Sequence, residues 1–159
     1  MKHYFSPYFS NPDWTTIPIF APLDGIITNI YPEMSLGQRI ELVSSAYPSM
    51  QALLFHVNPL GEIRVGQTVT AGQPLGYHIS THTGSDVAIK LNTVQGMKLV
   101  SYFDVMTNTL FNDYISRGVP NRATMIISKT ARDADTLTCD AFGGFTSTGT
   151  LPIWQTLEP

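Results

Sequence analysis

The stretch formed by residues 52–91 places the strongest limits on the fold. It reads ALLFHVNPLGEIRVGQTVTAGQPLGYHISTHTGSDVAIKL, and glycines and prolines cut it into short apolar runs. Apolar and polar residues alternate within these runs, a period of two that is typical of short strands joined by tight turns. Too few residues separate the runs for crossover helices. The pattern therefore favours an antiparallel sheet over a parallel one.

The residues before this stretch continue the strand pattern. Residues 17–30 indicate a strand, a turn at Asp24-Gly25 and a second strand, because Gly accepts positive φ and Asp can bond its own backbone. Further strands are expected over residues 39–43 and 51–57. Residues 1–16 are rich in aromatic side chains and contain two prolines, so we expect an irregular arm laid over the domain.

The pattern changes after residue 100. From Phe103 the apolar residues follow helical spacing, which predicts one helix over Tyr102–Arg117. Ser101 is a suitable N-cap, and Gly118 followed by Pro120 is a typical helix end. Beyond this helix, residues 124–128 (TMIIS) are expected to form a strand, and the polar residues 132–148 a loop with short strands.

The predicted fold class is mainly β. We expect a barrel-like sandwich built by residues 17–91, one helix in the C-terminal half, and a strand-rich tail. A length of 159 residues favours one domain, residues 1–159, in which residues 101–159 elaborate the β core.

Composition excludes several classes of function. The net charge of -3 gives no basic footprint for nucleic acid, and no apolar run is long enough to be a transmembrane segment. One cysteine, Cys139, excludes a disulfide framework and a cysteine zinc cluster within the chain. The N-terminus lacks an apolar signal core, so we expect a cytoplasmic protein, or one of the cell envelope from which a leader has been removed.

Several motifs together suggest a known family. They are FAPLDGII at residues 20–27, LFHV at 54–57, RVGQTVTAGQPLG at 64–76 and TGSDVAI at 83–89, of which the third is the most specific. Residues 17–91 thereby resemble the lysostaphin-type zinc endopeptidases of bacterial cell walls. The resemblance implies the duplicated-hybrid-motif barrel, which that family shares with lipoyl and biotinyl carrier domains.

The resemblance also implies where a zinc site would lie. The family holds zinc with a His and an Asp of an H-x-x-x-D motif and with the second His of an H-x-H motif. Two neutral imidazoles and a carboxylate bind Zn²⁺ tetrahedrally and leave one position for an activated water. Here Asp86-Val87-Ala88 takes the place of H-x-H, so Ala88 replaces a ligand. Asp13 can stand for the family's Asp, but Phe9 lies four residues before it.

Only His56, in the LFHV segment, matches a functional histidine of the family. We therefore expect a pseudoenzyme with no zinc, no other cofactor and no peptidase activity. The resemblance then implies a domain that binds a protein partner, or a cell-wall peptide or glycan, through the former active-site cleft. The candidate ligand-binding residues are His56, His78, His82, Asp86 and Asp13.

Two other functions stay open. The three histidines and Asp86 could form a rebuilt metal site in a peptidoglycan endopeptidase. The chain could also be a lipoyl- or biotinyl-like carrier or scaffold, although neither Lys90 nor Lys98 has the flanking residues of a carrier lysine.

Each candidate also has a purely structural interpretation. His56 is explained equally well as a hydrogen-bonded histidine of the core or sheet edge. Asp86, which follows Gly84-Ser85, is explained as a turn or capping residue. The charged cluster at residues 132–135 is explained as an ion-pair network that orders a turn.

Overall fold

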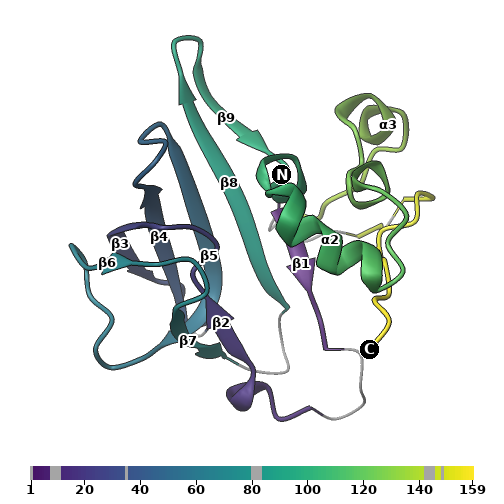
Figure 1. Ribbon diagram of the computed structural model, residues 1–159. Coiled ribbons are helices and arrows are strands. Elements are labelled where there is room, and N and C mark those ends of the chain that lie inside the picture. The colour runs from purple at the N-terminus through teal and green to yellow at the C-terminus, as the bar shows by residue number, and fades with distance from the viewer. Residues whose placement is uncertain (1, 8–11, 35, 80–83, 142–145, 148) are drawn as a thin grey trace. The chain divides into compact units, whose positions relative to one another are not determined.

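The chain forms two compact units, Met1–Tyr102 and Phe103–Pro159. The computed structural model describes residues 2–7, 12–34, 36–79, 84–141, 146–147 and 149–159. Nine antiparallel strands form one sheet in the first unit, so the predicted mainly β class is confirmed (Figure 1). The strands are β1 (Lys2–Phe5), β2 (Pro18–Phe20), β3 (Gly25–Pro32), β4 (Gln38–Ser44), β5 (Met50–Pro59), β6 (Thr68–Val69), β7 (Pro74–His78), β8 (Ser85–Thr93) and β9 (Gly96–Val100). The prediction of a single domain stays a prediction.

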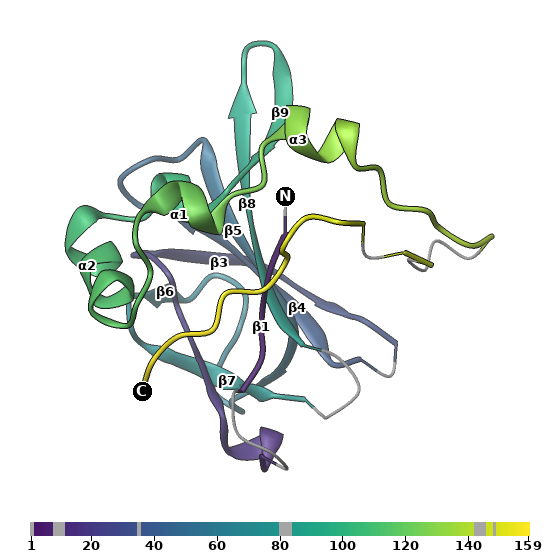
Figure 2. The ribbon, with the colours of Figure 1, turned by 90° about the vertical axis from the view of Figure 1, so that its right-hand side faces the viewer.

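The central strands run in the order β1-β8-β5-β4-β3-β6, and β7 pairs with both β5 and β2. Strand β8 has β5 along one edge. Its other edge is shared, because β1 lies opposite residues 85–88 and β9 lies opposite residues 89–93 (Figure 2). The expected irregular arm is therefore wrong for residues 2–5, which form a paired strand.

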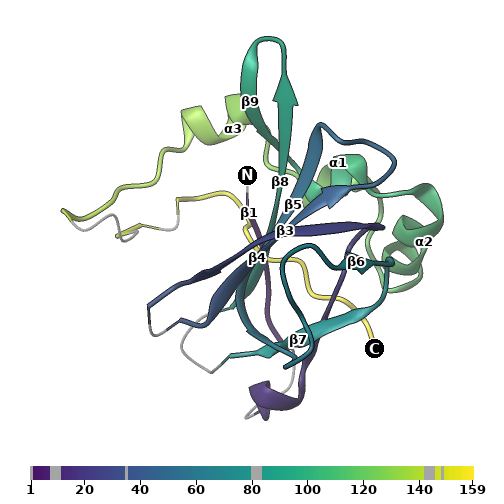
Figure 3. The ribbon, with the colours of Figure 1, turned by 90° about the vertical axis from the view of Figure 1, so that its left-hand side faces the viewer.

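The sheet of the first unit is curved (Figure 3), and its buried apolar side chains form one core cluster. Alternate residues of the central strands point into it, and Leu42 and Leu75 are completely buried. Burying one such side chain contributes roughly 1.5–3 kcal/mol. The core residues are Ala21, Ile27, Ile40, Leu42, Ala52, Leu54, Val57, Ile63, Val69, Leu75, Val87 and Ile89.

Two turns of identical construction, residues 64–67 and 70–73, explain the most specific sequence motif. In each, the fourth residue's amide donates to the first residue's carbonyl, at 3.2 and 3.0 Å. The third residue is a glycine with a φ of 85° or 82°, a conformation that favours glycine. The side chains of Gln67 and Gln73 accept from the first residue's amide, both at 3.2 Å. The two glutamines therefore order their own turns.

Gly76 belongs to the same sequence motif, but a glycine is needed there for a different reason. It lies in β7 between β2 and β5. A Cβ atom at this position would lie 2.3 Å from the carbonyl oxygen of Asn58, closer than atoms can pack. Only glycine lets three strands approach here.

The second unit is helical in its described part. Helix α1 (Tyr102–Val105) begins at the last residue of the first unit, and α2 (Asn108–Ser116), the 3-10 helix η2 (Arg122–Met125) and α3 (Lys129–Ala134) follow. Among the described residues after Val100 there is no strand, so the predicted strand at residues 124–128 is wrong. In the described part of the tail the β structure is limited to a bridge at Cys139, next to which the Thr146 amide donates to the Thr138 carbonyl at 2.8 Å. None of the helices in the described ranges has the length and apolar character needed to cross a membrane.

The predicted single helix over Tyr102–Arg117 is also wrong, because the chain breaks it before α2. Thr107 has extended backbone angles, with φ -62° and ψ 154°, and its side chain accepts from the amide of Leu110. This hydroxyl caps the N-terminus of α2, which explains why a new helix begins there. The apolar spacing continues across the break, since Phe103, Met106 and Phe111 are all buried.

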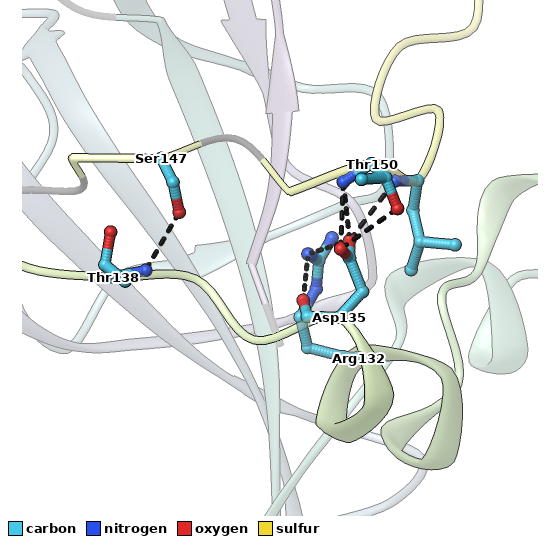
Figure 4. Close-up of polar contacts among 6 residues, drawn as sticks. Arg132, Asp135, Thr138, Ser147 and Thr150 are labelled. Atoms are coloured by element: carbon cyan, nitrogen blue, oxygen red, sulfur yellow. Dashed lines mark hydrogen bonds and ion pairs between the residues drawn. The ribbon is translucent and has the colours of Figure 1, made fainter.

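Asp135 anchors the C-terminal segment of the second unit (Figure 4). Its carboxylate accepts from the Thr150 amide at 2.8 Å and from the Leu151 amide at 3.2 Å, and it lies 3.3 Å from the Arg132 guanidinium. Gly149 has a φ of 69°, and a Cβ atom there would lie 2.3 Å from an Asp135 oxygen. The charged cluster at residues 132–135 therefore orders the chain around it, as its structural interpretation predicts.

Candidate functional site

A bulge in β5 places His56 on the outer face of the sheet. The register with β4 changes from Ile40–Leu54 to Gln38–Val57, so two residues of β5 lie opposite one residue of β4. His56 has a φ of 60°, and residues in this left-handed conformation often form such bulges. Leu54 and Val57 on either side remain in the core. The strict alternation of a strand would have turned the His56 ring toward the core.

Glu33 holds the His56 ring and backbone together. Its Oε2 accepts from the His56 amide at 2.9 Å and lies 3.2 Å from Nδ1 of the ring. The Leu36 carbonyl oxygen also lies 3.2 Å from Nδ1. Both neighbours are acceptors, so Nδ1 carries a proton in this arrangement. Glu33 thus offsets the strain of the left-handed backbone and fixes the ring orientation.

Asp86 lies on the opposite side of the ring. Its Oδ2 is 3.6 Å from His56 Nε2 and accepts a hydrogen bond from Lys2 Nζ at 3.2 Å. The Asp86 side chain is completely buried, and its Oδ1 has no hydrogen-bond partner among the described residues. Burial raises the pKa of Asp86, and the Lys2 ammonium offsets only part of that rise. We call Lys2, Glu33, His56 and Asp86 the His56 cluster.

Strand β1 brings Lys2 to this cluster. Lys2 lies opposite Ala88 in the antiparallel pairing with β8, and Tyr4 lies opposite Asp86. The Lys2 ammonium lies 3.5 Å from the centroid of the Phe55 ring, within the range of a cation–π interaction.

The sheet face beside the cluster carries further aromatic and basic side chains. The Arg39 guanidinium lies 4.8 Å from the Tyr31 ring centroid and 5.8 Å from that of Phe55. Tyr31 and Tyr4, on opposite sides of Phe55, are 43% and 47% exposed. Their exposed rings offer surfaces on which a peptide or a sugar can stack.

The other predicted site residues lie elsewhere or outside the described residues. Asp13 caps the 3-10 helix η1 (Trp14–Thr16), where its carboxylate accepts from the amide and hydroxyl of Thr15. His78 is buried in β7, and its ring lies 4.4 Å from that of Trp14. Phe9 and His82 fall outside the described residues.

The donors of the His56 cluster do not fit a zinc ion. Glu33 and Asp86 approach opposite nitrogens of the imidazole and so do not converge on one point. The Lys2 ammonium already occupies one oxygen of Asp86, and Ala88 has no donor atom. Within the described ranges, no three His, Cys, Asp or Glu side chains are grouped so that they could hold a metal ion.

Sequence reasoning missed Lys2 and Glu33. Lys2 lies 84 residues from Asp86 along the chain, and no local pattern connects such distant residues. A weak signal did exist, because the aromatic residues Tyr4 and Phe5 are of a type that is enriched in strands. Glu33 belongs to the loop after β3, for which the sequence offers no such pattern.

Comparisons with known proteins give similarity of structure alone. No family model and no curated protein sequence matches the chain. A Ruminococcus gnavus protein described as a glycyl-glycine endopeptidase is similar with a TM-score of 0.45 and 19% identity, covering 56% of this chain. The chain spans 40% of that protein's length.

Two further solved structures are similar to this chain. The catalytic domain of the antimicrobial peptidase lysostaphin from Staphylococcus simulans has a TM-score of 0.43 and 18% identity, over 62% of this chain and 86% of that one. A catalytic-domain mutant of a prophage-encoded M23 protein from Enterococcus faecalis has a TM-score of 0.43 and 17% identity, over 63% and 87%. At these identities and TM-scores, neither activity nor substrate transfers to this chain.

Proposed function

We propose that the chain is a non-catalytic, lysostaphin-peptidase-like domain that binds a cell-wall peptide or glycan at the His56 cluster. The observation that carries this proposal is the Lys2 ammonium, 3.2 Å from the Asp86 carboxylate that a metal would require. A positive charge in this place opposes the binding of a second cation. The sequence resemblance supports the ligand class, because the motifs of residues 17–91 are those of cell-wall peptidases.

The chemistry of the site suits binding. Asp86 offers an acceptor, Lys2 offers donors, and the exposed rings of Tyr4 and Tyr31 offer apolar surface. A buried acceptor without a partner is costly, so an N–H or O–H group of a ligand that reaches it gains a strong hydrogen bond.

An enzyme with a rebuilt metal site is the second candidate. The observation in its favour is His56, whose ring is fixed between two carboxylates in the manner of a general base. A carrier function has less support. Lys90 and Lys98 lie within paired strands, whereas the tip of the β8–β9 hairpin is formed by Val94 and Gln95.

Metal analysis and fragment binding test the proposal together. We expect purified protein dialysed against zinc to retain less than stoichiometric metal and to cleave no peptidoglycan. We expect soluble peptidoglycan fragments to bind, and Asp86→Asn to weaken their binding about tenfold or more, as the loss of a charge-assisted hydrogen bond predicts. The exposed carboxylate Glu62 provides the matched control, Glu62→Gln, which should bind like the natural protein.

One equivalent of tightly held zinc that is lost in His56→Ala or Asp86→Asn would establish the enzyme instead. If Asp86→Asn and Glu62→Gln bind the fragments equally well, the fragments bind outside the His56 cluster.

A further inference from the structure

Strand β1 is a short strand that covers part of one edge of β8. It has four residues, and each of them is exposed or half-buried. The four residues of β8 that it covers, Ser85–Ala88, are all buried. Strand β9 occupies the remainder of the same edge, so β1 fills a slot of fixed length.

Side chains on both faces of β1 contact the rest of the first unit. On one face the Lys2 ammonium reaches Asp86. On the other face His3 Nε2 lies 2.9 Å from the Ser101 hydroxyl, and Phe5 packs against the core. The slot therefore selects an extended segment by its side chains as well as by its backbone.

The pocket for the first residue of that segment, Lys2, is built for an alkylammonium group. Asp86 supplies a buried carboxylate 3.2 Å from the nitrogen, and the Phe55 ring lies 3.5 Å from it. Carboxylate and aromatic ring are the two partners that proteins use to bind primary amines. Ala88, which lies directly opposite Lys2 in the pairing, carries only a methyl group.

We propose that the edge of β8 at Ser85–Ala88 is a binding site for an extended peptide that carries a primary amine, and that β1 is its displaceable occupant. Strand addition gives such a peptide main-chain hydrogen bonds, and the pocket of Asp86 and Phe55 selects its lysine-like side chain. The inference rests on the proposed function only in placing the ligand at the His56 cluster.

The chain's own strand competes with any added peptide. A segment tethered by a short linker has an effective concentration in the millimolar range. A peptide in solution therefore binds the natural protein weakly, and it binds more tightly when the contacts of β1 are weakened.

The test uses the full chain and a fluorescent synthetic peptide with the sequence of residues 1–7. In Lys2→Met the strand keeps its length but loses its charge, and we expect this variant to bind the peptide about tenfold more tightly than the natural protein does. Lys98→Met, which removes an exposed lysine from β9 on the same edge, is the matched control and should leave peptide binding unchanged. A peptide with norleucine in place of lysine should bind Lys2→Met no more tightly than it binds the natural protein.

Equal peptide affinity of the natural protein and Lys2→Met would overturn the inference, as would an equal gain for the norleucine peptide. Asp86→Asn combined with Lys2→Met should abolish the gain, whereas Glu62→Gln combined with Lys2→Met should retain it. Peptidoglycan fragments are measured on the same proteins. Peptide exchange without fragment binding would overturn the proposed function alone, and fragment binding without peptide exchange would overturn this inference alone.

Discussion

At the scale of single residues, Asp86 is held in a balance between burial and a neighbouring cation. Burial favours the protonated carboxyl and raises the pKa of Asp86, while the Lys2 ammonium favours the charged form. A group whose pKa is raised on folding stabilises the protein below its unfolded pKa, and this contribution is lost as the pH rises through the folded pKa.

We therefore predict that Lys2→Met raises the pKa of Asp86 further and destabilises the protein in a pH-dependent way. The loss of unfolding free energy relative to the natural protein should be small below about pH 4, where Asp86 is protonated even in the unfolded chain, and larger at pH 7. Urea unfolding of both proteins, at a pH below about 4 and at pH 7, measures this loss of unfolding free energy. Lys98→Met should show no such difference, and a loss for Lys2→Met that is the same at both pH values would contradict the prediction.

The pKa of Asp135 shifts in the opposite direction, downward. Backbone amides of Thr150 and Leu151 donate to its carboxylate and lower its pKa. A depressed pKa stabilises the folded state above the unfolded pKa, and this contribution is lost as the pH falls through the folded pKa. Since Asp135 holds residues 150–151, acid should release that segment.

We predict that the amides of Thr150 and Leu151 lose hydrogen-exchange protection at about pH 2–3 relative to pH 5, after correction for intrinsic rates. In Asp135→Asn, where no carboxylate titrates, their protection should not depend on pH in this range. Equal acid sensitivity in this variant would assign the effect to another group.

The single residues of the site show what local sequence can and cannot predict. His56 and Asp86 were identified from motifs, and the structure brings them to 3.6 Å from each other. The partner Lys2 was not, because strand pairing over 84 residues, rather than any local spacing, creates the contact. The His56 ring faces outward because of a bulge, which the alternation of the sequence does not reveal.

At the scale of elements, one hydroxyl separates two helices. Thr107 caps α2, so Thr107→Ala should destabilise the protein by about 1 kcal/mol, a typical cost of losing an N-cap. The neighbouring Thr109, inside the same helix and exposed, provides the control, because Thr109→Ala should be neutral or slightly stabilising. Chemical denaturation measures both, and equal stabilities of the two variants would contradict a capping role.

The element boundaries explain where sequence patterns succeeded. The strands of residues 17–91 were predicted because alternation and turn glycines agree over most of this range, the bulge at His56 being an exception. The helix after Tyr102 was predicted as one piece, because apolar spacing records which face is buried and not whether the backbone is continuous. Of the strand expected at residues 124–128, the first two residues belong to the 3-10 helix η2, which Asn121 caps, and the other three are irregular. A short apolar run cannot distinguish the two.

At the scale of the whole molecule, the question is whether the two units unfold together in one cooperative transition. Leu75 is completely buried in the first unit and Phe111 is 4% exposed in the second. Leu75→Ala should cost about 2–5 kcal/mol and Phe111→Ala about 3–5 kcal/mol. If the chain is one domain, as its length predicts, both substitutions should lower the same calorimetric transition, and its midpoint should not depend on protein concentration.

Two separate transitions, each sensitive to one substitution, would instead show that the units unfold independently. A midpoint that rises with concentration would indicate that the apolar residues of the second unit are covered by another copy of the chain.

The pairing of β1 with β8 also has a consequence for synthesis on the ribosome. Translation delivers β1 before the edge that it pairs with, which emerges about 84 residues later. At the usual rate of roughly 5–20 residues per second, β1 waits several seconds without its partner. The pairing of β1 therefore has to follow the synthesis of β8, and a chain halted before residue 85 lacks the strand that would hold β1.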